Sequence, residues 1–178
     1  MKDNFYAPKA LGASKAGVEK YAEDLAKKIG FGPGDGIEEL VRKSGGKLVV
    51  GTSGFGDEDS GSIVARAVND FEIYVSRHTS LKRDRFTIAH ELGHLLLHFA
   101  AIKKADKNAV MRATRYVDQN DQDQQRAEWE ANWFAAAFLM PSEEFAAAYR
   151  KGGVAEAASV CGVSLHAAKI RADNLRIS

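Results

Sequence analysis

The residues of this sequence that are best suited to chemistry form one pentapeptide, His90-Glu91-Leu92-Gly93-His94. Positions four apart lie on one face of a helix, about 6 Å apart, so the two imidazoles can bind one metal ion. Glu91 stands beside them, where a carboxylate can take a proton from a water molecule. The spacing therefore predicts the metal-binding helix of a hydrolase.

The residues on either side of the pentapeptide help to decide whether the pattern is functional or a coincidence. A chain of this composition contains such a five-residue pattern by chance in about one case in a hundred. A Glu91 buried in this setting without a partner would cost several kcal/mol, which argues against a purely structural role. The surrounding stretch 85–98 is apolar except where the histidines and the glutamate point, and its apolar residues are Ile88, Ala89, Leu92, Leu95, Leu96 and Leu97.

Two imidazoles leave a catalytic zinc one protein ligand short. His98 lies eight residues after His90, which is about 12 Å along a helix and too far to share one ion. The extended motif with a third histidine needs glycine at position 97 and histidine at position 100, where this chain has Leu97 and Ala100. We therefore expect a carboxylate from another helix to be the third ligand.

Glu128 and Glu130 are the candidates for this third ligand. We favour Glu128 because Asn132 lies one turn further on the same face, where its amide can hold the second ring nitrogen of a ligating histidine. Glu130 shares a face with Phe134 and Ala137, so we interpret it as a carboxylate at the cleft edge or in a partly buried ion pair.

Length and composition indicate one compact domain, alone or with a small helical appendage. The 178 residues carry a net charge of +1, so the net charge of the chain does not attract nucleic acid or anionic membranes strongly. The single cysteine, Cys161, excludes an intramolecular disulfide and lies among apolar residues, which predicts a buried thiol. With neither a signal-peptide pattern nor a long apolar run, we expect a cytoplasmic protein.

Periodicity and capping residues predict a chain in which a small sheet leads into the His-Glu helix. We read the segment 51–61 as a loop flanking a cleft, and the segment 103–125 as a charged connection that is either a solvated loop or a lid. Helices are predicted over 14–29, 37–43, 85–98, 124–140, 142–150, 154–161 and 164–175, and strands over 47–50, 62–68 and 71–76, the last two joined by a turn at Asn69-Asp70.

Two linked stretches, RFTIAHELGHLLLH and EWEANWFAAAFLMP, resemble the ImmA/IrrE-type zinc metallopeptidases of bacteria and their mobile elements. The resemblance spans roughly residues 63–140 and extends loosely through VSLHAAKIRADNL near the end of the chain. It implies an α+β fold, a minimal zincin-like metalloprotease domain in which a small, antiparallel-containing sheet packs on the HExxH helix with additional helices. We expect this domain over residues 1–141, with a C-terminal helical extension over 142–178 packed on it.

The resemblance also implies roles for single residues. His90 and His94 match the first two metal ligands, Glu128 the third ligand, and Glu91 the catalytic base. Zinc is the expected ion, with manganese or iron as alternatives. The implied activity is site-specific cleavage of a helix-turn-helix repressor that relieves repression in a stress or mobile-element response. The expected partner is thus a protein substrate, without direct contact to nucleic acid or membrane, while the oligomeric state stays open.

Two other function classes fit parts of the sequence. One is a metal-stabilised interaction module that sequesters a regulator without cleaving it, for which Glu91 would be dispensable. The other is a DNA-binding protein whose C-terminal helices present Lys169, Arg171 and Arg176. The near-neutral net charge argues against this second class.

Three further expectations concern the surroundings of the site. A second oxyanion donor is usual in such sites. The strand that ends near Ser76 can align a substrate by strand addition if it is an exposed edge, and His98 can cap the C-terminus of its helix. The candidate oxyanion donors are Tyr74, His78, Arg115 and Tyr116.

Overall fold

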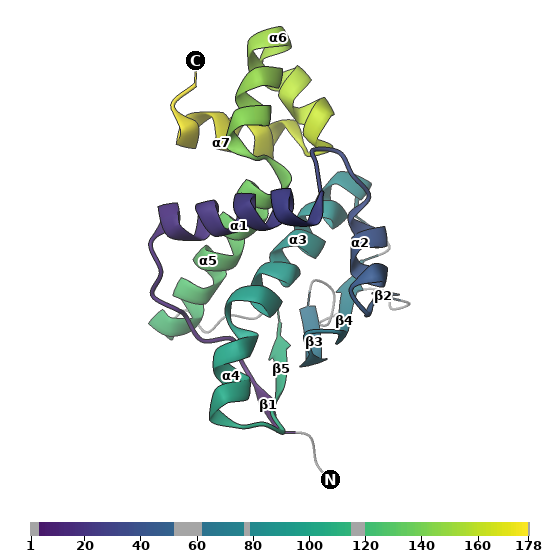
Figure 1. Ribbon diagram of the computed structural model, residues 1–178, viewed down its shortest axis with the longest axis vertical. Coiled ribbons are helices and arrows are strands. Elements are labelled where there is room, and N and C mark those ends of the chain that lie inside the picture. Colours follow the sequence, from purple (N-terminus) through teal and green to yellow (C-terminus); the bar gives the residue numbers. More distant parts are fainter. Residues whose placement is uncertain (1–3, 52–61, 77–78, 115–119, 178) are drawn as a thin grey trace.

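The computed structural model, which describes residues 4–51, 62–76, 79–114 and 120–177, has the expected α+β fold (Figure 1). A mixed sheet lies at one end of the molecule, and helices α6 and α7 lie at the other. The strands are β1 (Phe5–Tyr6), β2 (Gly46–Val50), β3 (Ser62–Ala67), β4 (Asp70–Val75) and β5 (Val110–Ala113). The helices are α1 (Lys15–Ile29), α2 (Ile37–Lys43), α3 (Leu81–Leu97), α4 (Phe99–Ala105), α5 (Gln122–Leu139), α6 (Ser142–Cys161) and α7 (Leu165–Leu175).

The five strands of the sheet are ordered β1-β5-β3-β4-β2. β3 runs antiparallel to β4 and β5, whereas β1 and β2 run parallel to their neighbours. Phe71, Ile73 and Val75 of β4 are buried, as their alternation predicts. β4 pairs with a strand on each side, so the prediction that the strand ending near Ser76 is an edge for strand addition is wrong.

Helix α3 carries the pentapeptide through the middle of the molecule. It contacts β3 and β4 of the sheet and packs against α5 (Figure 1). Ser80 caps its first turn by accepting a hydrogen bond from the backbone N–H of Arg83 (3.3 Å). Gly93 lies where α3 and α5 approach each other: a Cβ added there would lie 3.1 Å from the Cα atom of Ala131 and 3.2 Å from a ring carbon of Phe134. A larger residue at position 93 would therefore separate the two helices.

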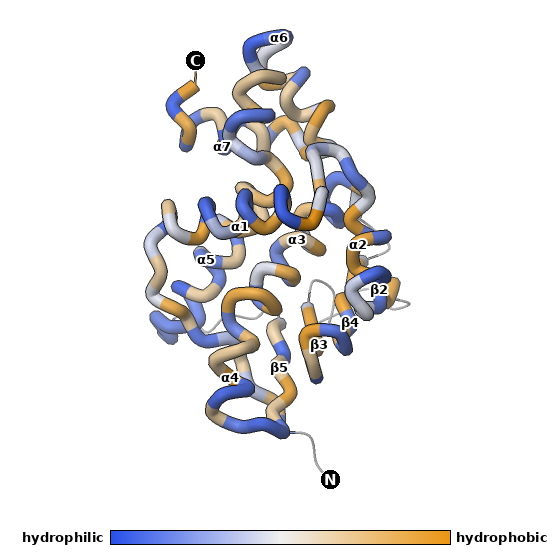
Figure 2. The backbone as a smooth tube through the Cα atoms, viewed as in Figure 1, coloured by the Kyte–Doolittle hydropathy of each residue, from blue (hydrophilic) through white to orange (hydrophobic). Residues whose placement is uncertain are grey.

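The prediction of one connection without regular structure over 103–125 is wrong, because two short elements interrupt that range. The end of α4 and strand β5 lie inside that range, and β1 near the N-terminus was not predicted. All three are too short to give a clear periodic pattern, and the segment between α4 and β5 is strongly hydrophilic (Figure 2). Residues 115–119, and residues 52–61 of the predicted cleft loop, lie outside the described residues.

The C-terminal helices are tied to α1 by Arg171, which is 1% exposed. Its guanidinium donates to Glu19 (2.7 Å), to Glu23 (2.9 Å) and to the carbonyl of Met140 (3.0 Å). This burial removes Arg171 from the basic surface that a DNA-binding role for α7 requires. The division into a domain over 1–141 and an extension over 142–178 stays a prediction.

Two smaller expectations for the C-terminal part are confirmed. Cys161 is a free, buried thiol, and burial raises its pKa to about 11. The two predicted helices over 142–150 and 154–161 appear as one helix, α6, with a kink at Gly152 and Gly153. Within the described residues, none of the helices combines the length and hydropathy that crossing a membrane requires.

Replacing Gly93 by valine should destabilise the fold by about 1–3 kcal/mol, because the added side chain meets backbone atoms of α5 that cannot move independently. Displacement of α5 should also weaken metal binding. Ala101→Val, at an exposed position of α4, is the matched control and should cost less than about 0.7 kcal/mol. Urea unfolding of the metal-free variants measures the two losses of stability, and competition with a chromophoric chelator measures the metal affinity. Equal losses in the two variants would show that the close approach at Gly93 has no special role.

Candidate metal centre

Helices α3 and α5 bring three potential metal ligands together: His90, His94 and Glu128. The Nε2 atoms of the two imidazoles are 3.1 Å apart. One carboxylate oxygen of Glu128 lies 3.1 Å from Nε2 of His90, and the other lies 3.1 Å from Nε2 of His94. All three residues offer ligand atoms that lie within 4.8 Å of one another. The two helices thus converge on one point from opposite sides.

This donor set suits a zinc ion. Two imidazole nitrogens and a carboxylate oxygen are a known catalytic set of three protein ligands, with a fourth position left for water or substrate. Donor atoms about 2.0–2.1 Å from zinc in a tetrahedral arrangement lie about 3.3 Å from each other. The observed separations of 3.1 Å come close to this value, and they involve both oxygens of Glu128, one beside each imidazole. The group can therefore hold a metal ion.

Burial and neighbouring charges give the three residues different proton affinities. Burial, together with the nearby His90 and His98, lowers the pKa of His94 to about 4, so its ring is neutral at physiological pH. Burial also tends to lower the pKa of His90. The hydrogen bond to Glu128 and the negative charges of Glu91 and Glu128 outweigh this effect, so the pKa of His90 is raised. Burial opposes ionisation of Glu128 as well, yet hydrogen bonds with both histidines hold its pKa far below the usual range. A neutral imidazole and an ionised carboxylate are the forms that bind metal.

Glu91 lies beside this group at the base of a small hollow. Its side chain is 2% exposed, and the hollow has a volume of about 220 Å³. The hollow is lined by Phe86, Thr87, His90, Glu91, His94, Ala113, Thr114, Glu128 and Asn132. A carboxylate, the three potential ligands and room for a small group thus share one space.

Asn132 lies where the helical spacing places it. Its side-chain oxygen lies 3.0 Å from Nδ1 of His90, and therefore accepts the hydrogen bond when that nitrogen carries the proton. This contact leaves Nε2 of His90 to face Glu128 and fixes the orientation of the ring.

Glu130 and His98 form a second, fully buried cluster behind His94. Nε2 of His98 lies 3.0 Å from one oxygen of Glu130, and both side chains are 0% exposed. The carboxylate of Glu130 also accepts hydrogen bonds from the backbone N–H groups of Leu11 (2.8 Å) and Ala13 (3.0 Å). Burial opposes its ionisation, but these N–H groups and His98 lower the pKa of Glu130 overall. Both of its oxygens thus have hydrogen-bond partners other than His90 and His94.

The cluster continues to the candidate ligand His94. Nδ1 of His94 lies 3.1 Å from Nδ1 of His98. One proton assignment satisfies both contacts of His98: His94 donates from Nδ1 to His98, and His98 donates from Nε2 to Glu130. In this tautomer Nε2 of His94 is unprotonated and can bind a metal ion, which would replace its hydrogen bond with Glu128. His98 thus orients His94. It also occupies the C-cap position of α3, as expected, but burial lowers the pKa of its imidazole and so disfavours a positive charge at that end of the helix.

Sequence reasoning missed this contact between His98 and His94, although a signal was present. The i, i+4 spacing that brings His94 next to His90 also brings His98 next to His94. Of the predicted oxyanion donors, Tyr74 donates its hydroxyl to Glu72 (3.2 Å) and lines a separate hollow on the sheet. The other three candidates, His78, Arg115 and Tyr116, lie outside the described residues.

Replacing Glu128 by alanine should lower zinc affinity by more than about 100-fold, because a direct ligand contributes more than the outer contacts whose loss costs about 10–100-fold. His90→Ala should act in the same direction. Competition with a chromophoric chelator gives the affinities, and elemental analysis gives the stoichiometry. Full zinc content in Glu128→Ala, combined with loss in Glu130→Ala, would identify Glu130 as the ligand instead.

Replacing His98 by phenylalanine keeps most of the side-chain volume but removes both imidazole hydrogen bonds. We expect zinc affinity to fall by about 10–100-fold, since the ring of His94 is no longer held. The metal-free protein should also lose stability because the charge of Glu130 loses a partner. Glu156→Gln, on an exposed part of α6, is the control for handling and assay. Wild-type zinc affinity in His98→Phe would refute the orienting role.

The comparisons with known proteins agree with this geometry. The fold is similar to that of a Mycobacterium tuberculosis transcriptional regulator, with a TM-score of 0.58 and 20% identity. The match covers 86% of this chain and 54% of the regulator, so this chain spans about half the length of that structure. At this identity the likeness supports the fold alone.

Family membership comes from the sequence. No curated protein matches the chain. A family model of peptidases, described as the IrrE N-terminal-like domain, matches residues 55–173. This range contains the pentapeptide, the third candidate ligand and most of the C-terminal helices, which agrees with the resemblance noted from the motifs. The chain therefore belongs to the IrrE N-terminal-like peptidase family.

Proposed function

We propose that this protein is a zinc-dependent endopeptidase that cleaves one or a few protein substrates. The observation that carries the proposal is the buried carboxylate of Glu91 beside the converging ligand atoms of His90, His94 and Glu128. Membership in a peptidase family supports the same reaction class. Manganese and iron are the alternative ions, because the same imidazole and carboxylate donors also bind them.

A zinc ion held by His90, His94 and Glu128 would polarise the scissile carbonyl and lower the pKa of a water molecule toward 7. Glu91 is the general base: its carboxylate accepts a proton from the attacking water and then delivers it to the departing amine nitrogen. The buried setting suits this role, because a carboxylate with little water around it interacts strongly with a proton placed beside it. Asn132 and His98 keep the two imidazoles in fixed orientations during the reaction.

The proposed substrate is a helix-turn-helix transcriptional repressor, whose cleavage would relieve repression in a stress or mobile-element response. The resemblance to the ImmA/IrrE-type peptidases supports this class, and the chain belongs to the IrrE N-terminal-like peptidase family. The proposal places the reaction in the cytoplasm, where the buried thiol of Cys161 stays reduced. It involves no direct contact between this chain and DNA.

The substitution Glu91→Gln separates cleavage from sequestration. The amide keeps the size of the side chain and leaves His90, His94 and Glu128 in place, so zinc and the fold should be retained. Cleavage of the candidate repressor should slow by at least about a hundredfold, or 2.7 kcal/mol, because an amide cannot accept the proton. Gel electrophoresis of the repressor over time measures the rate.

Release of promoter DNA from the repressor is measured in the same samples, with Glu156→Gln as the control that should behave like wild type. Under the peptidase proposal, Glu91→Gln binds the repressor but does not free its DNA. If Glu91→Gln frees the DNA as well as wild type does, the protein acts by sequestering the repressor and peptidase activity is not its mechanism.

A further inference from the structure

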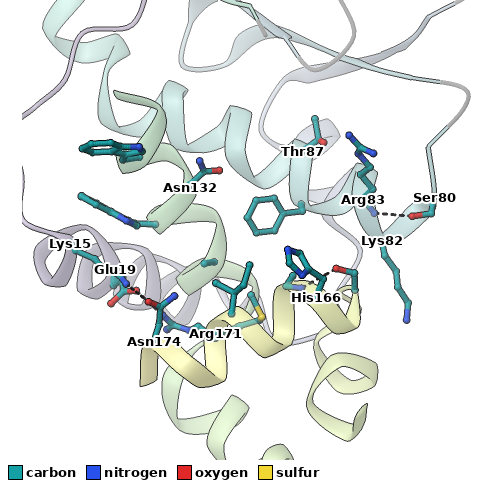
Figure 3. A pocket seen from close by; sticks show the side chains of 18 residues that line it. Lys15, Glu19, Ser80, Lys82, Arg83, Thr87, Asn132, His166, Arg171 and Asn174 are labelled. Carbon is teal, nitrogen blue, oxygen red and sulfur yellow. Dashed lines mark hydrogen bonds and ion pairs between the residues drawn. The ribbon is translucent and has the colours of Figure 1, made fainter. Parts of the chain in front are cut away.

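A large cavity lies next to the metal hollow. It has a volume of about 750 Å³ and is formed by residues of α1, α3, α5 and α7 (Figure 3). Phe86, Thr87 and Asn132 line both this cavity and the metal hollow. Asn132 also contacts the candidate ligand His90, so the cavity lies one side chain away from the candidate metal centre.

The floor of the cavity is apolar, and part of it is open to solvent. Trp129 and Ile170 remain 53% and 47% exposed, although both are large hydrophobic residues. They face the same space as Phe86 and Trp133, which come from α3 and α5. Exposed apolar side chains gathered in a hollow, rather than scattered singly, indicate a surface that binds another molecule.

The rim of the cavity is basic. Four basic side chains and one acidic side chain line it: Lys15, Lys82, Arg83, Arg171 and Glu19. The one acid, Glu19, is paired with Arg171 at 2.7 Å. Lys15 contacts the neutral amide of Asn174, and in the described part of the chain neither Lys82 nor Arg83 has an ion-pair partner. Within the described residues, the positive charges of Lys15, Lys82 and Arg83 therefore line the cavity without forming an ion pair.

From this arrangement we infer that the cavity is the recognition site for a segment of the substrate polypeptide that carries large apolar side chains and acidic residues. The inference rests on the proposed peptidase function and adds a substrate class to it. The apolar side chains fill the floor formed by Trp129 and Ile170. The acidic side chains pair with Lys82 and Arg83, which belong to the first turn of α3 and line the cavity. Such charge pairing selects acidic sequences and accelerates their encounter with the site.

A peptide fits these features better than a nucleic acid does. Phosphates would satisfy the basic rim, but the net charge of the chain is only +1, and strong binding to a phosphate backbone requires many contacts with cations. A peptide that extends from the cavity also places its backbone over the metal hollow, since the two spaces share Phe86, Thr87 and Asn132.

Binding of short fluorescein-labelled peptides to the zinc-loaded Glu91→Gln protein tests the inference without any cleavage. The first peptide contains leucine and phenylalanine among glutamates and serines. The second has lysine in place of each glutamate, and the third has serine in place of each leucine and phenylalanine. Fluorescence anisotropy should give at least about tenfold tighter binding of the first peptide than of the other two.

Variants with matched controls locate the binding. Ile170→Asp, and the pair Lys82→Glu with Arg83→Glu, should each weaken binding of the first peptide by about tenfold or more. Leu165→Asp alters an equally exposed apolar residue of α7 outside the cavity, and Lys104→Glu with Lys107→Glu alters charges outside it. These controls should bind like the parent protein. Zinc content and thermal unfolding should be the same in all variants, because every changed side chain is exposed.

Four results would overturn the inference. These are equal binding of all three peptides, equal effects of cavity and control variants, full competition by a DNA oligonucleotide, or dimerisation that Ile170→Asp abolishes while no peptide binds. None of them touches the proposed function, which repressor cleavage by the wild-type protein tests separately. Conversely, if peptides bind at the cavity but the wild-type protein cleaves no repressor, the recognition site is supported and the proposed peptidase function is contradicted.

Discussion

Helices α3 and α5 approach within van der Waals contact of each other's backbones because residue 93 has no side chain. Most of the candidate centre depends on this constraint. His90 and His94 lie one turn apart on α3, while Glu128 comes from α5, so the distance between the two helix axes decides whether the three donor atoms meet. The second cluster, with His98 and Glu130, joins the same two helices. The helix pair therefore works as one rigid unit that sets the geometry of the ligands before any ion binds.

Buried charges connect this unit to the rest of the chain. Glu130 is held by backbone N–H groups of Leu11 and Ala13, which ties the segment before α1 to the centre of the molecule. Arg171 similarly links the C-terminal part of the chain, because its hydrogen bonds join α7 to α1 and to the end of α5. Buried charges of this kind are costly unless every partner is in place. They therefore favour a single arrangement of the terminal segments around α3 and α5.

Features that depend on local sequence could be predicted. The pairing of His90 with His94 follows from helical spacing, the limits of α1 follow from Ser14 and Gly30, and the buried face of β4 follows from its alternation. Helical spacing also placed Asn132 beside His90. These signals lie within a few residues of one another, so no knowledge of tertiary structure is needed to read them.

What could not be predicted depends on contacts between distant segments. The strands β1 and β5 are too short for a periodic pattern; they form because β5 pairs with β3 and β1 pairs with β5. For Glu130 the sequence left open a carboxylate at the cleft edge or a partly buried ion pair, and the structure has it in a buried pair with His98. Nothing nearby in the sequence indicates that the backbone of Leu11 and Ala13 reaches it. Arg171 likewise resembled a surface cation, since its partners Glu19 and Glu23 lie about 150 residues earlier. The cavity beside the metal hollow needs four helices from separate parts of the chain, so the sequence alone gave no sign of it.

The proposed function requires His90, His94 and Glu128 to hold one zinc ion together. Anomalous X-ray diffraction from crystals of the zinc-loaded protein, collected on both sides of the zinc absorption edge, can locate that ion. We expect a single strong anomalous peak within about 2.2 Å of Nε2 of His90, Nε2 of His94 and a carboxylate oxygen of Glu128, with His98 and Glu130 still bonded to each other behind it. A peak coordinated by Glu130 or His98, or zinc bound only elsewhere on the protein, would contradict it.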